Sequence, residues 1–303
     1  MFVAQRGIGG IVTDIQQHTQ GAPEWVEMRD GRRLYAMVLA DEKAETATAT
    51  VVFEAGSGTA RFSWAKVQPG VGRFARAIVY DRSGLGRSAF DPAGRTLARM
   101  ADDLNEVLDH FGPGPFILVG HSAGGPIVRL AAARRPDRVA GLVLVDPTDE
   151  AAEVLFGRAF RWFERIALAV GTVLARLRLL EKVYAWQLRI VPDDVRRDME
   201  REAFTPGVLR TQRQQAATYL DELATWRDNP PELGLIPVTA ISGGRAGDGM
   251  SAAMRAKANA SHAYRAAQSP RGRHVIAEHS SHYVVATEPE LIVAEIERLM
   301  PPT

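Results

Sequence analysis

The stretch 116–134 constrains the fold more than any other part of the chain. It begins with Phe-Ile-Leu-Val, a short apolar run typical of a buried parallel strand. Gly-His-Ser-Ala-Gly follows at 120–124, and the next apolar run favours a helix that ends before Pro136. A Gly-x-Ser-x-Gly turn between a strand and a helix is typical of a catalytic serine, here Ser122. The alternative is a plain glycine-rich turn, because five-residue matches of this kind also occur by chance.

The residues around Ser122 fit a sharp turn that presents a nucleophile. Gly120 and Gly124 carry no side chains that would collide where the strand and the helix nearly touch. The start of the helix leaves the backbone N–H of Ala123 free to bind a developing negative charge on oxygen. We therefore expect Ala123 to supply half of an oxyanion hole.

Strands and helices alternate along most of the chain, which predicts an α/β fold: a mostly parallel sheet flanked by helices on both faces. A hairpin is expected around Asp30-Gly31-Arg32, and amphipathic helices are expected over 62–74, 97–111 and 289–300. The remaining predicted strands are Thr50–Glu54, Ala77–Tyr80, Phe116–Val119, Val139–Val145, Val238–Ser242 and His274–Ile276.

This alternation stops between residues 148 and 231, where only helical patterns occur. The predicted helices there are 151–163, 166–188, 193–204 and 208–226. We expect a helical cap at 148–231, inserted into a core formed by 1–147 and 232–303 and lying over the carboxyl edge of the sheet. Its apolar residues should pack on the core and line a pocket. Its interleaved arginines should form a solvated face, with a role at a membrane surface as the alternative.

Composition excludes several classes of function. The net charge of +1, with both signs interspersed, gives no sign of nucleic-acid binding. The chain has no cysteine, so disulfides, thiolate metal sites and cysteine nucleophiles are excluded. The apolar stretch 166–180 is too short and too charged for stable membrane insertion, and the first 21 residues show neither a signal peptide nor a strong pattern. We expect a cytoplasmic location.

Several ordered motifs resemble the α/β-hydrolase superfamily between about Trp25 and Met300. The segment 80–88 is similar to the family's Asp-x-x-Gly-x-Gly-x-Ser turn, and 281–283 with 288–291 is similar to its catalytic-histidine loop and last helix. Ala-Gly-Ser-Gly at 55–58 occupies the place of the family's His-Gly loop. The alanine replaces the usual histidine, so the resemblance carries over only a backbone N–H, that of Ser57, as the other half of an oxyanion hole.

The resemblance also implies the general base and the reaction class. His279 and His282 both lie in the loop after the last strand, and the match of the following segment favours His282 as the base. Serine at position 122 excludes the dehalogenase and epoxide-hydrolase branches, which need aspartate there. No pair of histidines has the helical spacing of metal ligands with a carboxylate between them, so no metal is expected.

Two aspartates are candidates for the acid that orients the histidine. Asp146 directly follows the strand 139–145, so a rigid strand end fixes its height above the sheet; its alternative role is to cap the next helix. Asp248 follows the strand 238–242, the usual place in the family, but lies deep in a glycine-rich loop. The sequence leaves both open.

Together these residues predict a serine hydrolase, a carboxylesterase acting on small to medium apolar esters through an acyl-enzyme, without cofactor or metal. The expected partner is a small-molecule ester, and the oligomeric state is left open. The same residues could serve an amidase, lactonase, C–C bond hydrolase, perhydrolase or hydroxynitrile lyase. A ligand-binding receptor with low turnover is the alternative outside enzymes.

Overall fold

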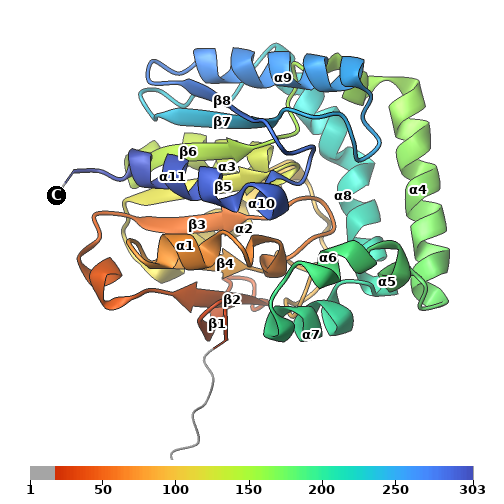
Figure 1. Ribbon diagram of the computed structural model, residues 1–303, viewed down its shortest axis with the longest axis horizontal. Helices are drawn as coiled ribbons and strands as arrows, with labels where there is room; N and C mark the ends of the chain where they lie inside the picture. The colour runs from red at the N-terminus through yellow and green to blue at the C-terminus, as the bar shows by residue number, and fades with distance from the viewer. Residues whose placement is uncertain (1–17, 303) are drawn as a thin grey trace, which may run out of the picture.

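A single sheet of eight strands organises the computed structural model, which describes residues 18–302 (Figure 1). The strands are β1 (Ala22–Glu27), β2 (Arg33–Leu39), β3 (Thr50–Glu54), β4 (Ala77–Tyr80), β5 (Phe116–His121), β6 (Val139–Val145), β7 (Val238–Gly243) and β8 (Arg273–Ala277). Their order in the sheet is β1-β2-β4-β3-β5-β6-β7-β8. Only β2 runs opposite to its neighbours, and β3 to β8 are parallel. The predicted α/β fold with a mostly parallel sheet is confirmed.

The central strands are apolar throughout because helices cover both of their faces. Side chains alternate across a strand, so Leu118 enters one core while Ile117 and Val119 enter the other. Helices α2 (Leu97–Phe111) and α3 (Gly124–Arg134) pack on the first face. Helices α1 (Gln68–Gly72), α10 (Val284–Thr287) and α11 (Pro289–Leu299) pack on the second. This double cover explains why no polar alternation marks the central strands in the sequence.

The remaining helices lie between β6 and β8 in the chain. They are α4 (Arg158–Arg176), α5 (Leu180–Val183), α6 (Ala185–Arg189), α7 (Asp193–Glu202), α8 (Pro206–Ala224) and α9 (Ala252–Ala267). None of the helices described between residues 18 and 302 combines the length and the apolarity needed to cross a membrane.

Three helix predictions were wrong in detail. The helix expected over 62–74, with a kink at Pro69-Gly70, is instead a 3₁₀ turn (Arg61–Trp64) followed by α1, because Pro69 fits only the first turn of a helix. The break expected near residue 165 is absent, since α4 runs through it; α4 ends where Arg178 adopts a positive φ of 56°. Helix α9 was not predicted at all.

Helices α4 to α8 lie beyond the carboxyl ends of the strands (Figure 1). Two hydrogen bonds join α8 to loops at that edge: the Tyr219 hydroxyl donates to the Ala123 carbonyl (2.6 Å), and Thr211 donates to the Gly84 carbonyl (2.9 Å). The described residues 148–231 contain no strand. This helical segment, residues 148–231, therefore covers the edge where folds of this class place their sites.

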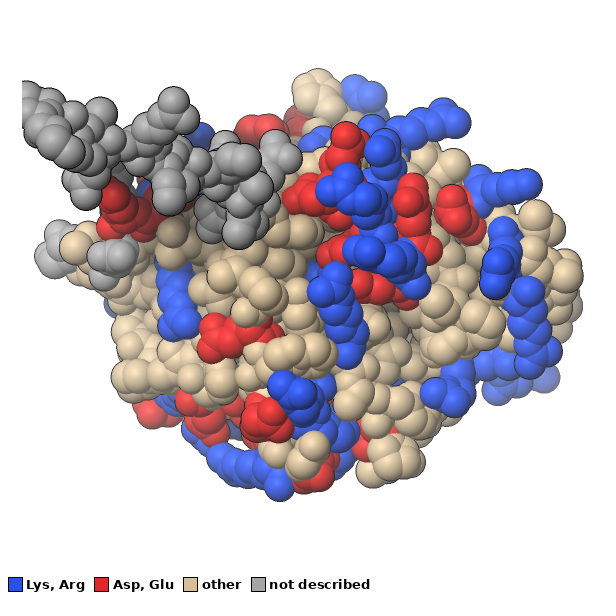
Figure 2. Space-filling model, turned by 90° about the horizontal axis from the view of Figure 1, so that it is seen from below, with Lys and Arg blue, Asp and Glu red and all other residues tan. Residues whose placement is uncertain are grey.

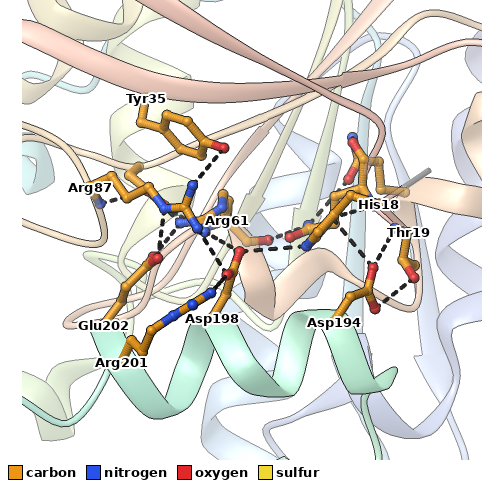
Figure 3. A network of polar contacts seen from close by, with 12 residues as sticks. His18, Thr19, Tyr35, Arg61, Arg87, Asp194, Asp198, Arg201 and Glu202 are labelled. Carbon is orange, nitrogen blue, oxygen red and sulfur yellow. Dashed lines mark hydrogen bonds and ion pairs between the residues drawn. The ribbon is translucent and has the colours of Figure 1, made fainter. Parts of the chain in front are cut away.

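Buried ion pairs fasten α7 to the sheet (Figure 3). Arg61 is fully buried and donates to Asp81, which follows β4, and to Asp198 and Glu202 of α7, at 2.6, 2.6 and 2.7 Å. Arg87 donates to the same two α7 carboxylates at 2.9 and 2.7 Å. Arg61 bridges acids of α7 and the acid that follows β4, and Arg87, from the turn after β4, binds two acids of α7. Helix α7 is therefore held to the sheet by charge as well as by packing.

The first described residues join this network. The backbone and the hydroxyl of Thr19 donate to Asp194 of α7 at 2.6 and 3.0 Å, and His18 lies 3.6 Å from the same carboxylate (Figure 3). Gln20 is almost fully buried and bonds to Gln68. Residues 18–20 of the stretch up to Gly21 are thus bound to the rest of the protein, and residues 1–17 lie outside the described chain.

Candidate active site

Ser122 occupies a strained turn between β5 and α3. Its φ is +53°, a conformation that non-glycine residues rarely adopt. The strain persists because the turn is fixed on both sides: Ser122 N–H donates to the Val145 carbonyl (3.0 Å), and the Ser122 carbonyl accepts from Gly125 and Thr148 (3.0 and 2.9 Å). A side chain at Gly124 would lie 2.5 Å from a backbone carbonyl, so the close contact of helix and strand requires glycine there.

His282 and Asp146 come together above the ends of β8 and β6. The Nδ1 of His282 lies 2.6 Å from the Oδ2 of Asp146. The other carboxylate oxygen accepts from the Gly243 backbone N–H at 3.0 Å and from the Arg255 guanidinium. No group of helix N–H donors is bound to Asp146, so the alternative capping role has no support in its contacts. Its carboxylate instead orients the His282 ring.

Burial by itself would raise the pKa of Asp146, which is only 4% exposed. The hydrogen bond and charge of His282 and the guanidinium of Arg255 outweigh burial and hold the pKa well below its usual range. Asp146 is therefore ionised at neutral pH, as a carboxylate that stabilises an imidazolium must be.

Asp248 contacts the same histidine residue through its backbone. Its carboxylate accepts from the backbone N–H of His282 (3.1 Å) and from the Ser281 hydroxyl. Asp248 is exposed and has a positive φ of 51°. It thus fixes the loop that carries His282, whereas Asp146 contacts the imidazole ring. His279, the rival base, is exposed and bonds to Arg245 at 3.0 Å.

A second histidine supports the loop of His282 and was not assigned a role from the sequence. The ring of His121 lies 4.8 Å from the ring of His282 between centroids, and its Nε2 is 3.1 Å from the His282 carbonyl oxygen. A carbonyl accepts, so Nε2 carries the hydrogen. Burial lowers the pKa of His121 to about 3, with the charge of His282 acting in the same direction. A neutral His121 is therefore built into the site.

Peptide orientation makes Ser57 and Ala123 suitable as oxyanion donors. Arg82 donates to the carbonyls of Ala55 and Gly56, and because N–H and C=O point in opposite directions across a trans peptide, the Ser57 N–H points away from Arg82. The Ser122 carbonyl is likewise occupied by two N–H donors, which turns the Ala123 N–H the other way.

The loop of Ser57 passes beside the candidate nucleophile. A Cβ built on Gly56 would lie 3.4 Å from the Ser122 Cβ and 3.2 Å from His121 Nδ1. Only a residue without a side chain leaves this space open next to the serine. The sequence analysis assigned the turn after β4 no role at the site and therefore missed Arg82, which pairs with Glu54 and fixes this loop.

Two histidines and Ser242 form a hydrogen-bonded chain beside Asp146. His262 Nε2 lies 2.8 Å from the Pro147 carbonyl, so its Nδ1 accepts from Ser242 (2.7 Å), which in turn accepts from His274 (2.8 Å). Burial lowers the pKa of both histidines. No local pattern indicates this cluster, because its members are far apart in the chain.

A cavity of about 320 Å³ lies between the site and the helical segment. Ser57 and Tyr283, the neighbour of His282, line it from the core; α4 contributes Phe160 and Phe163, and Tyr184 and Phe204 line it from farther along the helical segment. The rings of Tyr184 and Phe204 stack at 6.2 Å. The cavity is thus mainly apolar and aromatic on the side of the helical segment, with Glu164, Gln187 and Gln212 as polar exceptions.

Residues 18–302 contain no group of three or more His, Asp or Glu side chains arranged to hold a metal ion. The site instead combines a serine in a strained turn, a histidine whose ring contacts a buried carboxylate, and the backbone N–H groups of Ser57 and Ala123. Such groups at the carboxyl edge of a mostly parallel sheet are typical of α/β enzymes that use a serine, a histidine and an acid.

Comparison with known proteins agrees with this class. The family described as alpha/beta hydrolase fold matches residues 49–289, and the chain belongs to this family. A protein of a Caulobacter species, provisionally named carbamate hydrolase RutD, is 40% identical over 101 residues, which are 32% of this chain and 37% of that protein. Lipase LipV of Mycobacterium tuberculosis is 46% identical over 67 residues, 22% of this chain and 25% of the lipase. The matched part thus spans less than two fifths of either relative.

Solved structures share the fold over nearly the whole chain. An epoxide hydrolase, CorEH, aligns with a TM-score of 0.69 and 19% identity, covering 92% of this chain and 98% of that one. An N-acyl homoserine lactone degrading enzyme aligns with a TM-score of 0.64 and 17% identity, covering 91% and 99%. At these identities the likeness concerns the fold alone.

Proposed function

We propose that the protein is a serine hydrolase of the carboxylesterase type, with Ser122, His282 and Asp146 as its triad. The observation that carries this proposal is the 2.6 Å contact between His282 Nδ1 and the buried Asp146 carboxylate, together with a serine held at a φ of +53° whose N–H bonds to Val145, the residue before Asp146. A carboxylate at Nδ1 requires the hydrogen on that nitrogen, which leaves Nε2 free to accept the proton of the Ser122 hydroxyl.

The reaction follows from these positions. As Nε2 of His282 takes the proton, Ser122 Oγ bonds to the carbonyl carbon of the ester, and the carbonyl oxygen becomes negatively charged. The N–H groups of Ser57 and Ala123 stabilise that charge. The C–O bond to the alcohol then breaks, and His282 returns the proton to the leaving alcohol. Water, deprotonated by His282, releases the acid from the acyl-enzyme by the reverse sequence.

The substrate class is inferred from the cavity beside the site. Its aromatic lining from α4 and the segment around Tyr184 and Phe204 favours an apolar acyl or alcohol group. We propose that residues 148–231 act as a cap over a core of 1–147 and 232–303, and that this cap selects substrates by size. The names of the two partial relatives, a carbamate hydrolase and a lipase, support attack on a carbonyl.

Hydrolysis of p-nitrophenyl esters of increasing acyl length tests the proposal. Wild type should turn over short and medium esters, and Ser122→Ala should lose on the order of a million-fold in kcat. The free energy of unfolding should change by no more than about 1 kcal/mol, because the half-buried serine side chain packs little.

Ser57→Ala is the matched control. Only the backbone N–H of Ser57 is proposed to act, so this variant should keep most of the activity. Labelling of the wild type by a fluorophosphonate should fall on Ser122. Labelling of a different serine, or a Ser122→Ala variant as active as wild type, would contradict the proposal.

A further inference from the structure

An apolar surface is exposed on the helical segment. In the described part of the chain, all of the exposed large apolar side chains except Trp25, Leu235 and Tyr264 lie between residues 162 and 190. The two most exposed of them belong to α4, where Trp162 is 68% and Phe163 is 64% exposed. Exposed apolar residues gathered in one segment, unlike single ones, indicate an interaction surface.

Helix α4 packs one side on the protein and exposes apolar residues on the other. Four of its exposed apolar residues, Trp162, Ile166, Val170 and Val173, recur at helical spacing and share one face with Leu177, the residue directly after the helix. The opposite face is buried through Leu168, Gly171, Thr172 and Ala175. A Cβ on Gly171 would lie 3.2 Å from a side-chain carbon of Leu209 in α8, so this side is in close contact. An ordinary surface helix carries polar residues on its outer face, so the apolar outer face of α4 is unusual.

Arginines line one edge of the exposed face. Arg158, Arg165 and Arg176 are spaced by 7 and 11 residues, which puts them on one side of the helix next to Trp162. All three are exposed, and none forms an ion pair among the described residues. Residues 158–190 hold seven basic residues and only two acids, Glu164 and Glu181. At the right of Figure 2, where this end of the molecule lies, basic side chains separated by uncharged surface predominate.

We propose that this face of α4 docks on the surface of an anionic lipid bilayer. An apolar helix face that includes a tryptophan and is flanked by arginines fits the boundary between acyl chains and headgroups. The arginines at its edge would contact lipid phosphates while the apolar residues enter the acyl boundary. The helix lies along the bilayer surface in this arrangement and does not cross it.

Charge favours this occupant over a second copy of the chain. A symmetric dimer through α4 would bring the arginine-rich segments of two copies together, with only two acids on each to offset them. An anionic bilayer supplies the missing negative charge. Docking would also place the cavity at the lipid surface, because Phe163 is both exposed and part of the cavity lining.

Binding to vesicles tests the proposal without depending on hydrolysis. The full chain is mixed with vesicles of ether-linked phosphatidylglycerol, which contain no ester to cleave, or of ether-linked phosphatidylcholine, and the bound fraction is measured by sedimentation. We expect binding to the anionic vesicles, weakened by salt, with a blue shift of tryptophan emission as Trp162 leaves water.

Two variants and their matched controls separate the parts of the face. Arg158→Gln/Arg165→Gln/Arg176→Gln should weaken binding roughly a hundred-fold, since each basic residue near an anionic surface contributes about five-fold. Its control, Arg73→Gln/Arg197→Gln/Arg271→Gln, removes the same charge from exposed arginines elsewhere and should bind more tightly than the α4 variant.

For the apolar part, Trp162→Ser/Val173→Ser should lose binding and the emission shift. Leu235→Ser, at a position 73% exposed away from this face, should keep both. Equal binding to both kinds of vesicle, no binding to either, or α4 variants that bind like wild type would overturn the proposal. So would a wild-type dimer that Trp162→Ser/Val173→Ser converts to monomer, because a second copy would then cover the face.

Discussion

Asp146→Asn gives the sharpest test of the site, because one carboxylate is expected to act on both turnover and stability. Asn keeps the size of the side chain but removes the charge that holds the His282 ring and stabilises its protonated form. In triads of this kind that loss costs about ten-thousand-fold in kcat. Four factors of ten correspond to about 5.4 kcal/mol in the activation free energy.

The stability effect follows from Arg255. Its side chain is 4% exposed and pairs with the Asp146 carboxylate, so Asp146→Asn leaves a buried guanidinium without its counter-charge. Removing one partner of a buried ion pair costs about 3–5 kcal/mol. The Tm of Asp146→Asn should therefore fall by roughly 6–20 °C, at about 2–4 °C per kcal/mol.

A double variant separates the two effects. Asp146→Asn/Arg255→Gln removes both charges, so it should recover part of the lost Tm while turnover stays as low as in Asp146→Asn. Asp248→Asn is the comparison at the other candidate. Its exposed carboxylate accepts only from the Ser281 hydroxyl and the His282 backbone, and an amide oxygen can still accept. This variant should lose less than ten-fold in kcat.

The assay is kcat for p-nitrophenyl acetate together with the Tm from thermal unfolding. If Asp146→Asn loses stability but keeps more than a tenth of the wild-type kcat, Asp146 serves Arg255 and not catalysis. If Asp248→Asn shows the larger loss in kcat, the role of the acid belongs to Asp248.

Further predictions concern the base, the pocket and the dependence of stability on pH. His282→Ala should lower kcat as strongly as Ser122→Ala, because the two act as one unit, whereas His279→Ala should keep most activity; the reverse pattern would reassign the base. Phe204→Ala should change the rates on long esters more than on the acetate; uniform loss across the series would make the helical segment a scaffold. The folded protein keeps His121 neutral down to its pKa of about 3, while the same histidine in the unfolded chain binds a proton below about pH 6.5. The free energy of unfolding should therefore decrease as the pH falls from about 6.5 to about 3, by up to about 1.4 kcal/mol per pH unit. His121→Gln should flatten this slope in urea titrations at successive pH values, and an unchanged slope would show that other groups cause it.

Local patterns were sufficient to predict the sheet. Each predicted strand is present, because β5 and β6 are continuous apolar runs bounded by glycine or proline, and such runs have few alternatives. The sharp turn at Ser122 could also be predicted, since Gly120 lies against Gly124 across the turn and the two residues are close together in the chain. Boundaries within the helical segment were less clear, because a residue such as Arg178 ends a helix by adopting a conformation that its identity does not reveal.

The choice between Asp146 and Asp248 could not be made from the sequence for a physical reason. Both follow parallel strands that end at the same edge of the sheet, so both reach the residue His282. What separates them is whether the carboxylate meets the ring or the backbone, a difference of a few ångströms. The register of β6 against β7 and the path of the loop after β7 decide it, and neither is visible in local patterns.

Helix α9 could not be predicted from hydrophobic periodicity, because the residues with which it contacts the site are polar. Its buried positions include Arg255, Ser261, His262 and Arg265, so it has no apolar stripe for a periodicity argument to detect. The alanines of α9 favour a helix by propensity, and Ser251 caps it by accepting from Met254, but these signals alone are weak. The polar face is needed because α9 packs where the acid is held: Arg255 pairs with Asp146, and His262 continues the hydrogen bonds behind it. A stretch with helix-forming composition but polar residues at its buried positions is therefore itself a signal that a charged site lies beneath it.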